Sequence, residues 1–184
     1  VTRGEIKPGQ TVLIQAAGSG IGQAAIQVAK FFGARIIATA GTDMKCRRAA
    51  KLGAHETINY SKGDFSTTVR QLTDNKGVDI VFEHVGASTF PGSIASLKKG
   101  GRIVTCGVTT GREVTLDLRY LFMNQLSIHG SYMGSHAELL KVVDLAKKGI
   151  LNPVVDSVFP LRDAAKAQGR MESRNFFGKI VLKP

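Results

Sequence analysis

Short apolar runs alternate with helix-spaced segments along the first 150 residues of the chain. Apolar residues recur at helical spacing after each run, most clearly at 137–148. The runs themselves have the composition of strands buried on both faces, and they lie at 12–17, 35–40, 78–85 and 102–106. Strands that alternate with helices in this way indicate a parallel sheet with right-handed crossovers.

Two shorter runs, at 57–60 and 126–132, bring the expected strands to six. The expected helices are at 21–32, 43–52, 64–74, 89–98 and 137–148. The sequence therefore predicts an α/β fold with a doubly wound parallel sheet, the Rossmann fold, over residues 1–150.

The tail at 151–184 does not continue this regular alternation of strands and helices. It is expected to form a strand, a helix and a strand, at 154–159, 162–171 and 178–182. This tail could extend the main sheet or belong to a second unit.

The segment 11–30 predicts a strand, a turn of small residues and a helix. Such a turn lets the backbone approach a pyrophosphate, and the helix N-terminus supplies free N–H groups. The fit to the G-x-G-x-x-G fingerprint is imperfect, because alanine and serine occupy the first two glycine positions. The candidate pyrophosphate-binding residues are Ala17, Gly18, Ser19, Gly20, Ile21 and Gly22.

The end of the second strand indicates which nicotinamide cofactor binds. An acidic residue there would accept from the adenosine ribose and repel a 2′-phosphate. The chain instead has a small neutral loop at 40–42, closed by Thr42, with no carboxylate before Asp43. Lys45, Arg47 and Arg48 follow, which favours NADP(H) over NAD(H) unless these cations only form a solvated helix face.

Composition and charge narrow the class of protein. The net charge of +11 comes from 25 basic residues spread along the chain, which favours a solvated surface over a nucleic-acid partner. No apolar stretch approaches the roughly 20 residues of a membrane span, and no signal peptide is visible. Cys46 and Cys106 have no zinc spacing and fit a cytoplasmic location. The start at Val1 without a methionine suggests a segment of a longer protein.

No catalytic side chain and no metal site is predicted. The tyrosines lack the lysine four residues later that short-chain dehydrogenases use, which excludes that class. Glu83 and His84 are interpreted as a hydrogen-bonded pair at a strand end in preference to a proton relay. Cys106 is expected to be a small buried residue. Hydride transfer needs positioning and exclusion of water more than a nucleophile.

An ordered set of sequence blocks resembles the medium-chain dehydrogenase/reductase superfamily, most closely its quinone oxidoreductase and alcohol dehydrogenase-like branch. The blocks are AAGSGIGQAAIQVAK after KPGQTVLI, ATAGTDMKCRRAAKLGAHETINY, VDIVFEHVG, GGRIVTCG and FGKIVL. The resemblance implies that residues 17–22 bind the pyrophosphate and that Lys45 and Tyr60 hold a 2′-phosphate. It also implies that Gly86, Gly107, Val108 and Met133 line the ribose and nicotinamide.

The same resemblance implies a larger enzyme. Members of the superfamily carry a GroES-like catalytic domain before this segment, so the segment alone is expected to be inactive. The tail at 151–184 would pack back toward that domain. The strand at 126–132 would pair with its copy across a two-fold axis and form a homodimer.

Three functions follow from these predictions. The first is the cofactor-binding part of an NADP(H)-dependent oxidoreductase that transfers hydride to a quinone, an enone or an aldehyde. The second is an enoyl-reductase module of a polyketide or fatty-acid synthase. The third is a nucleotide-responsive binding protein that contacts RNA through its basic surface.

Overall fold

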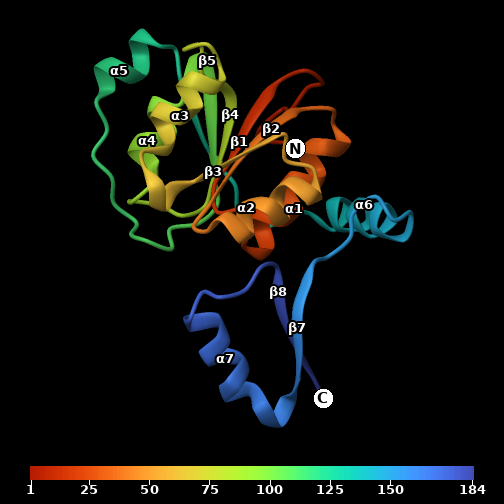
Figure 1. Cartoon of the computed structure of the whole chain (residues 1–184). Helices are drawn as coiled ribbons and strands as arrows, with labels where there is room; N and C mark the ends of the chain where they lie inside the picture. The colour runs from red at the N-terminus through yellow and green to blue at the C-terminus, as the bar shows by residue number, and fades with distance from the viewer.

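A computed structural model describes all 184 residues and has a six-stranded parallel sheet at its centre (Figure 1). The strand order is β3-β2-β1-β4-β5-β6. The first strand therefore lies in the middle of the sheet, the second and third extend it on one side, and the last three extend it on the other. The strands are β1 (Thr11–Ile14), β2 (Arg35–Ala40), β3 (Glu56–Asn59), β4 (Val78–Glu83), β5 (Leu97–Thr105) and β6 (Ser127–Gly130). This order confirms the predicted doubly wound fold.

Helices cover both faces of the sheet because successive strand residues point to opposite sides. On one side Val12 and Ile14 pack with α1 (Gly20–Phe31) and α2 (Asp43–Leu52). On the other side Leu13 packs with α3 (Phe65–Leu72) and α4 (Phe90–Ala95). The central strands therefore carry apolar side chains on both faces of the sheet.

Two predicted boundaries near the fifth strand are wrong. The helix expected at 89–98 ends at Ala95, and β5 begins at Leu97, because Leu97 pairs with Val78 at the start of β4. The short helix α5 (Leu118–Met123) was not predicted. Asp117 caps it by accepting from the N–H groups of Arg119 and Tyr120.

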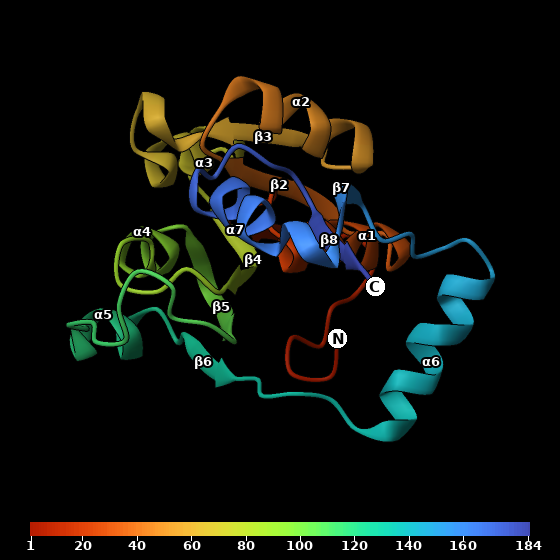
Figure 2. The ribbon, with the colours of Figure 1, turned by 90° about the horizontal axis from the view of Figure 1, so that it is seen from below.

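The tail forms a unit of its own below the carboxyl edge of the main sheet (Figures 1 and 2). Its strands β7 (Val155–Pro160) and β8 (Lys179–Lys183) pair in parallel, with α7 (Ala164–Glu172) between them. The unit joins the main body through Phe177, which is 1% exposed and belongs to the α1–α2 side of the core. The tail therefore does not extend the main sheet.

The helix α6 (His136–Lys147) extends away from the body of the molecule (Figure 1). Ser135 and Glu138 form a capping box at its start, which agrees with the helix expected at 137–148. Its apolar side chains, including Leu139 and Leu140, are largely exposed. None of the helices combines the length and the apolar character needed to cross a bilayer.

Candidate nucleotide-binding site

The turn between β1 and α1 has the geometry of an anion-binding site. Ser19 caps α1, and its Oγ accepts from the Gly22 N–H at 2.8 Å. The N–H groups of Gly18, Gly20 and Ile21 have no partner within the chain. Free N–H groups at a helix N-terminus favour a phosphate, so the turn fits the pyrophosphate of a dinucleotide.

Serine replaces the central glycine of the fingerprint without strain. The Ser19 backbone has φ −76°, a value that any residue adopts. Gly22, in contrast, must be glycine, because a Cβ there would lie 2.4 Å from the Ala16 carbonyl oxygen. The first turn of α1 therefore lies close against the end of β1, and it can do so because Gly22 has no Cβ.

The end of β2 lies beside this turn and carries no free carboxylate. Thr42 caps α2 by accepting from the Lys45 N–H at 3.2 Å. Asp43 is occupied by Lys62 at 2.7 Å and Asn59 at 2.8 Å. These two bonds hold the pKa of Asp43 below its usual value, and its negative charge is already paired with Lys62.

Lys45 reaches from α2 across to the glycine turn. A Cβ at Gly18 would lie 3.2 Å from the Lys45 Cδ, and the Lys45 Nζ donates to the Arg174 carbonyl at 2.5 Å. Burial, followed by the charge of Arg174, lowers the pKa of Lys45, while Asp156 opposes the shift. A phosphate between Lys45 and the turn would oppose this shift, because a nearby negative charge raises the pKa of a lysine.

Tyr60 lies across the loop from Thr42. A Cβ at Gly41 would be 2.8 Å from the Tyr60 hydroxyl, so the hydroxyl lies directly against the loop backbone. The ring is 47% exposed, which leaves it accessible from the carboxyl edge. The structure thus brings Thr42, Lys45 and Tyr60 together at one end of the sheet, beside Ala17 to Gly22.

A second turn follows β4 and is built with close backbone contacts. Gly86 has φ 97°, and a Cβ there would lie 2.5 Å from the Gly111 carbonyl oxygen and 3.0 Å from the Val108 Cα. A Cβ at Gly107 would lie 2.7 Å from the His84 carbonyl oxygen. Gly86, Gly107 and Val108 therefore meet at the carboxyl ends of β4 and β5.

Met133 belongs to neither turn. It is 82% exposed and follows β6. It lines a cavity of about 810 Å³ between α1, the N-terminal segment and α6. The lining is mostly apolar, and Ile21 is the only residue of the turn at 17–22 in it.

The three candidate catalytic residues are not arranged as a proton relay. Burial lowers the pKa of His84, and its Nε2 lies 2.9 Å from the Gln15 carbonyl oxygen, to which the neutral ring can donate. Glu83 is fully buried among hydrogen-bond donors. Cys106 is exposed, so the prediction of a buried residue is wrong, because β5 ends at Thr105. Partial burial and then Glu83 raise the pKa of the Cys106 thiol, which keeps it protonated near neutral pH.

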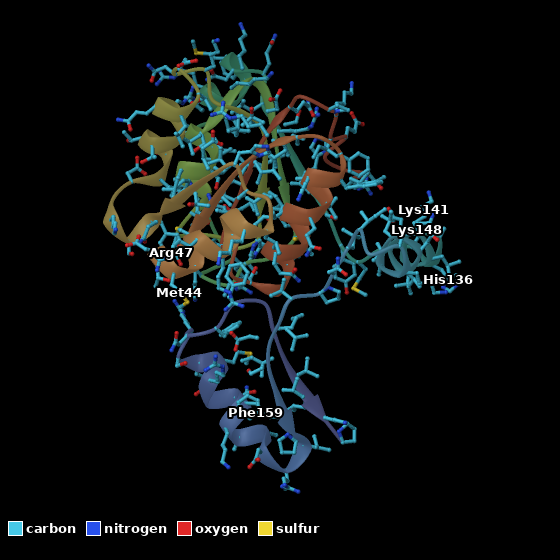
Figure 3. The ribbon with its side chains drawn as sticks, turned by 45° about the vertical axis from the view of Figure 1, so that its right-hand side comes forward. Met44, Arg47, His136, Lys141, Lys148 and Phe159 are labelled. Carbon is cyan, nitrogen blue, oxygen red and sulfur yellow. The ribbon has the colours of Figure 1, made fainter.

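Sequence reasoning missed two residues of the tail that reach the turn. The Arg174 carbonyl holds the Lys45 Nζ. The Lys179 side chain crosses Gly20, where a Cβ would lie 2.6 Å from its Cδ. Both residues lie within three positions of Phe177, and the sequence alone gives no local signal that this segment crosses the turn. Figure 3 shows Met44 and Arg47 on the side of α2 that faces the tail unit.

The structure contains no group of three or more His, Cys, Asp or Glu side chains that could hold a metal ion. The turn at 17–22 instead offers free N–H groups beside the Lys45 cation, and the nearby Asp43 carboxylate is already paired with Lys62. This donor set suits an anionic nucleotide.

Comparison with known proteins places the chain in a family. The family model of the zinc-binding dehydrogenases matches residues 20–148. A 2-haloacrylate reductase from a Burkholderia species is 37% identical over 98% of this chain, which covers 57% of that protein.

Two solved structures are similar over nearly the whole chain. An NAD-dependent alcohol dehydrogenase is 47% identical with a TM-score of 0.94, over 100% of this chain and 54% of that one. The Escherichia coli quinone oxidoreductase complexed with NADPH is 32% identical with a TM-score of 0.87, over 98% and 59%. The chain thus spans a little over half the length of these relatives. It belongs to the zinc-binding dehydrogenase family, within the medium-chain dehydrogenase/reductase superfamily.

Proposed function

We propose that this chain is the cofactor-binding part of an NADP(H)-dependent oxidoreductase that transfers hydride to a quinone, an enone or an aldehyde. The observation that carries the proposal is the turn at 17–22, whose unpaired N–H groups face the carboxyl edge beside Lys45. The bound nicotinamide would supply the hydride. The residues of the chain would bind the pyrophosphate, hold both riboses and orient the ring.

The preference for NADP(H) rests on the charges around the second strand. Asp43 is the first carboxylate after β2, and Lys62 and Asn59 already occupy it. Lys45 places one cation beside the turn, the charge of Arg174 acts on Lys45, and Tyr60 adds a hydroxyl. A 2′-phosphate would therefore meet donors and a cation without an unpaired carboxylate.

Replacing Lys45 with methionine tests this preference. We expect NADPH to bind at least tenfold more weakly, because one charge-assisted bond to the 2′-phosphate is lost. NADH, which lacks that phosphate, should bind as before. The affinities can be measured by titration of dihydronicotinamide fluorescence.

Lys51→Met is the matched control, since it removes the same charge from the last turn of the same helix. It should leave both affinities within twofold. An equal loss of NADPH and NADH affinity in Lys45→Met would contradict the proposed 2′-phosphate contact.

The substrate side of the proposal extends beyond this chain. In the superfamily a GroES-like domain supplies most substrate contacts, and we propose the same division here. The domain boundary near residue 150 and a role for the tail unit against that domain belong to the same proposal. The enoyl-reductase module and the nucleotide-responsive binding protein stay predictions.

The outer strand supports a homodimer. β6 pairs only with β5, so its second edge is free, and Ile128 on it is 39% exposed. An open edge pairs readily with a second copy. We expect sedimentation at micromolar concentration to give a dimer, and Ile128→Pro, which removes an edge N–H, to give a monomer. A wild-type monomer would contradict this proposal.

A further inference from the structure

Glu83 is a fully buried carboxylate at the end of β4, with no cation among its partners. Its Oε1 accepts from the N–H groups of Val85 at 2.7 Å and Gly86 at 3.2 Å. Its Oε2 accepts from the hydroxyls of Ser93 at 2.6 Å and Thr89 at 2.9 Å. Backbone N–H groups need an acceptor, so the site is built for a carboxylate.

A continuous chain of hydrogen bonds leads from Glu83 to the glycine turn. Ser93, on α4, also accepts from the Gln15 Nε2 at 3.0 Å. The Gln15 Oε1 accepts from the Thr39 hydroxyl at 2.7 Å, and the Thr39 Oγ1 accepts from the Ala16 N–H at 3.1 Å. The side chains of Glu83, Ser93, Gln15 and Thr39 are all fully buried, so no solvent competes for these bonds.

The chain of bonds ends at the strained residue of the turn. Ala16 has φ 48°, a left-handed conformation that costs a residue with a Cβ about 1–2 kcal/mol. This conformation aims the Ala16 carbonyl at the Ser19 N–H, 3.0 Å away, and against Gly22. The Thr39 Oγ1 accepts from the N–H of Ala16, so hydrogen bonds at both the N–H and the carbonyl of Ala16 fix where the turn begins.

The other end of the chain of bonds holds the second turn. Gly86 also has positive φ, and Glu83 accepts from its N–H. The Thr89 hydroxyl donates to the Glu83 carboxylate at 2.9 Å and lies 3.3 Å from the Gly86 carbonyl oxygen, the alternative acceptor for its one proton. One carboxylate therefore fixes the loop after β4 directly and the loop after β1 through three side chains.

We propose that Glu83 is a positioning residue that sets the spacing between the two turns, so that one dinucleotide can contact both. This inference rests on the proposed function, because only a ligand that spans both turns would report their spacing. His84 reinforces the connection, since its ring is hydrogen-bonded to the Gln15 carbonyl oxygen. Glu83 touches neither the ligand nor the reacting atoms in this arrangement and acts through Gly86 and Ser93.

The test breaks the chain of bonds at a residue that belongs to neither turn. Ser93→Ala removes the bonds to Glu83 and to Gln15. Ser96→Ala is the matched control, because Ser96 is equally buried beside α4 but donates only to the Gly92 carbonyl. Should Ser93→Ala fail to fold, Thr39→Val carries the test, since valine has the shape of threonine and suits a strand.

Two ligands distinguish a change in the spacing of the two turns from a general loss of structure. In the proposed binding mode NADPH would span both turns, whereas adenosine 2′-monophosphate would reach only the loop after β2. We expect Ser93→Ala and Thr39→Val each to weaken NADPH binding about tenfold, as loss of a buried hydrogen bond to a fixed geometry would. The double variant should lose little more than either single one, because both interrupt one chain of bonds. Adenosine 2′-monophosphate should bind as before, and Ser96→Ala should match the wild type.

The outcomes are distinguishable. A wild-type chain that binds no dinucleotide would overturn the proposed function and this inference with it. NADPH binding that is unchanged in Ser93→Ala or, where that variant does not fold, in Thr39→Val would overturn the inference alone. So would an equal loss for both ligands, since a merely structural role weakens every site alike.

Discussion

Replacing Gly22 with alanine is expected to destabilise the chain by about 2–3 kcal/mol and to remove most of its affinity for a dinucleotide. The added Cβ would lie 2.4 Å from the Ala16 carbonyl oxygen and 3.0 Å from the Ala17 Cα. Both neighbours are backbone atoms, so either α1 or the turn must move. Chemical denaturation and NADPH titration would measure the two effects.

Gly20→Ala is the control for this prediction. The three atoms nearest to a Cβ at Gly20 all belong to the Lys179 side chain, with the Cδ at 2.6 Å, and that flexible chain can move aside. We expect its free energy of unfolding to stay within about 0.5 kcal/mol of the wild type. Equal stability of Gly22→Ala and Gly20→Ala would show that the close approach of α1 to β1 is not a structural requirement.

Replacing Phe177 with alanine is expected to cost about 3–5 kcal/mol and to detach the tail from the main body. Phe177 is 1% exposed, packs with the α1–α2 side of the core, and lies 4.6 Å from the Arg48 guanidinium. Its loss should also release Arg174 from Lys45, so NADPH binding should weaken. Denaturation, NADPH titration and hydrogen exchange in β7 and β8 would report these changes.

Phe159→Ala provides the matched control. Phe159 lies on β7 in the tail unit, away from α2, as Figure 3 shows, and pairs with Leu182 of β8. Its replacement should loosen the tail unit and leave the main body and NADPH binding unchanged. If Phe159→Ala and Phe177→Ala weakened NADPH binding equally, the contact through Phe177 would not be what couples the tail to the turn.

The central part of the fold could be predicted because its signals are local. Each buried strand reads as an apolar run, and the small residues at 17–22 mark the strand-to-helix turn. Gly53 ends α2, as expected of a C-terminal glycine. The loop at 40–42 showed that no acidic residue closes β2, and the structure adds that Asp43 is already paired.

The remaining features depend on contacts between distant segments. Nothing in the local pattern of Arg174 or Lys179 indicates that the tail crosses the glycine turn, which depends on Phe177 and on the bond from the Gly178 N–H to the Gly18 carbonyl at 2.8 Å. The sequence predicts Glu83 only as part of a hydrogen-bonded pair with His84 at a strand end. Its role became visible once Ser93 and Gln15, far apart in sequence, were seen to share its hydrogen bonds.

The central claim is that a nicotinamide dinucleotide binds across the carboxyl edge of the sheet, from the turn at 17–22 to the turn at Gly86. The most direct measurement is a titration of the ¹⁵N-labelled chain with NADPH, followed by amide chemical shifts. We expect the largest saturable shifts at the unpaired N–H groups of Gly18, Gly20 and Ile21 and at Gly86 and Gly107. Shifts confined to the apolar cavity between α1 and α6, or no shifts at all, would contradict the claim.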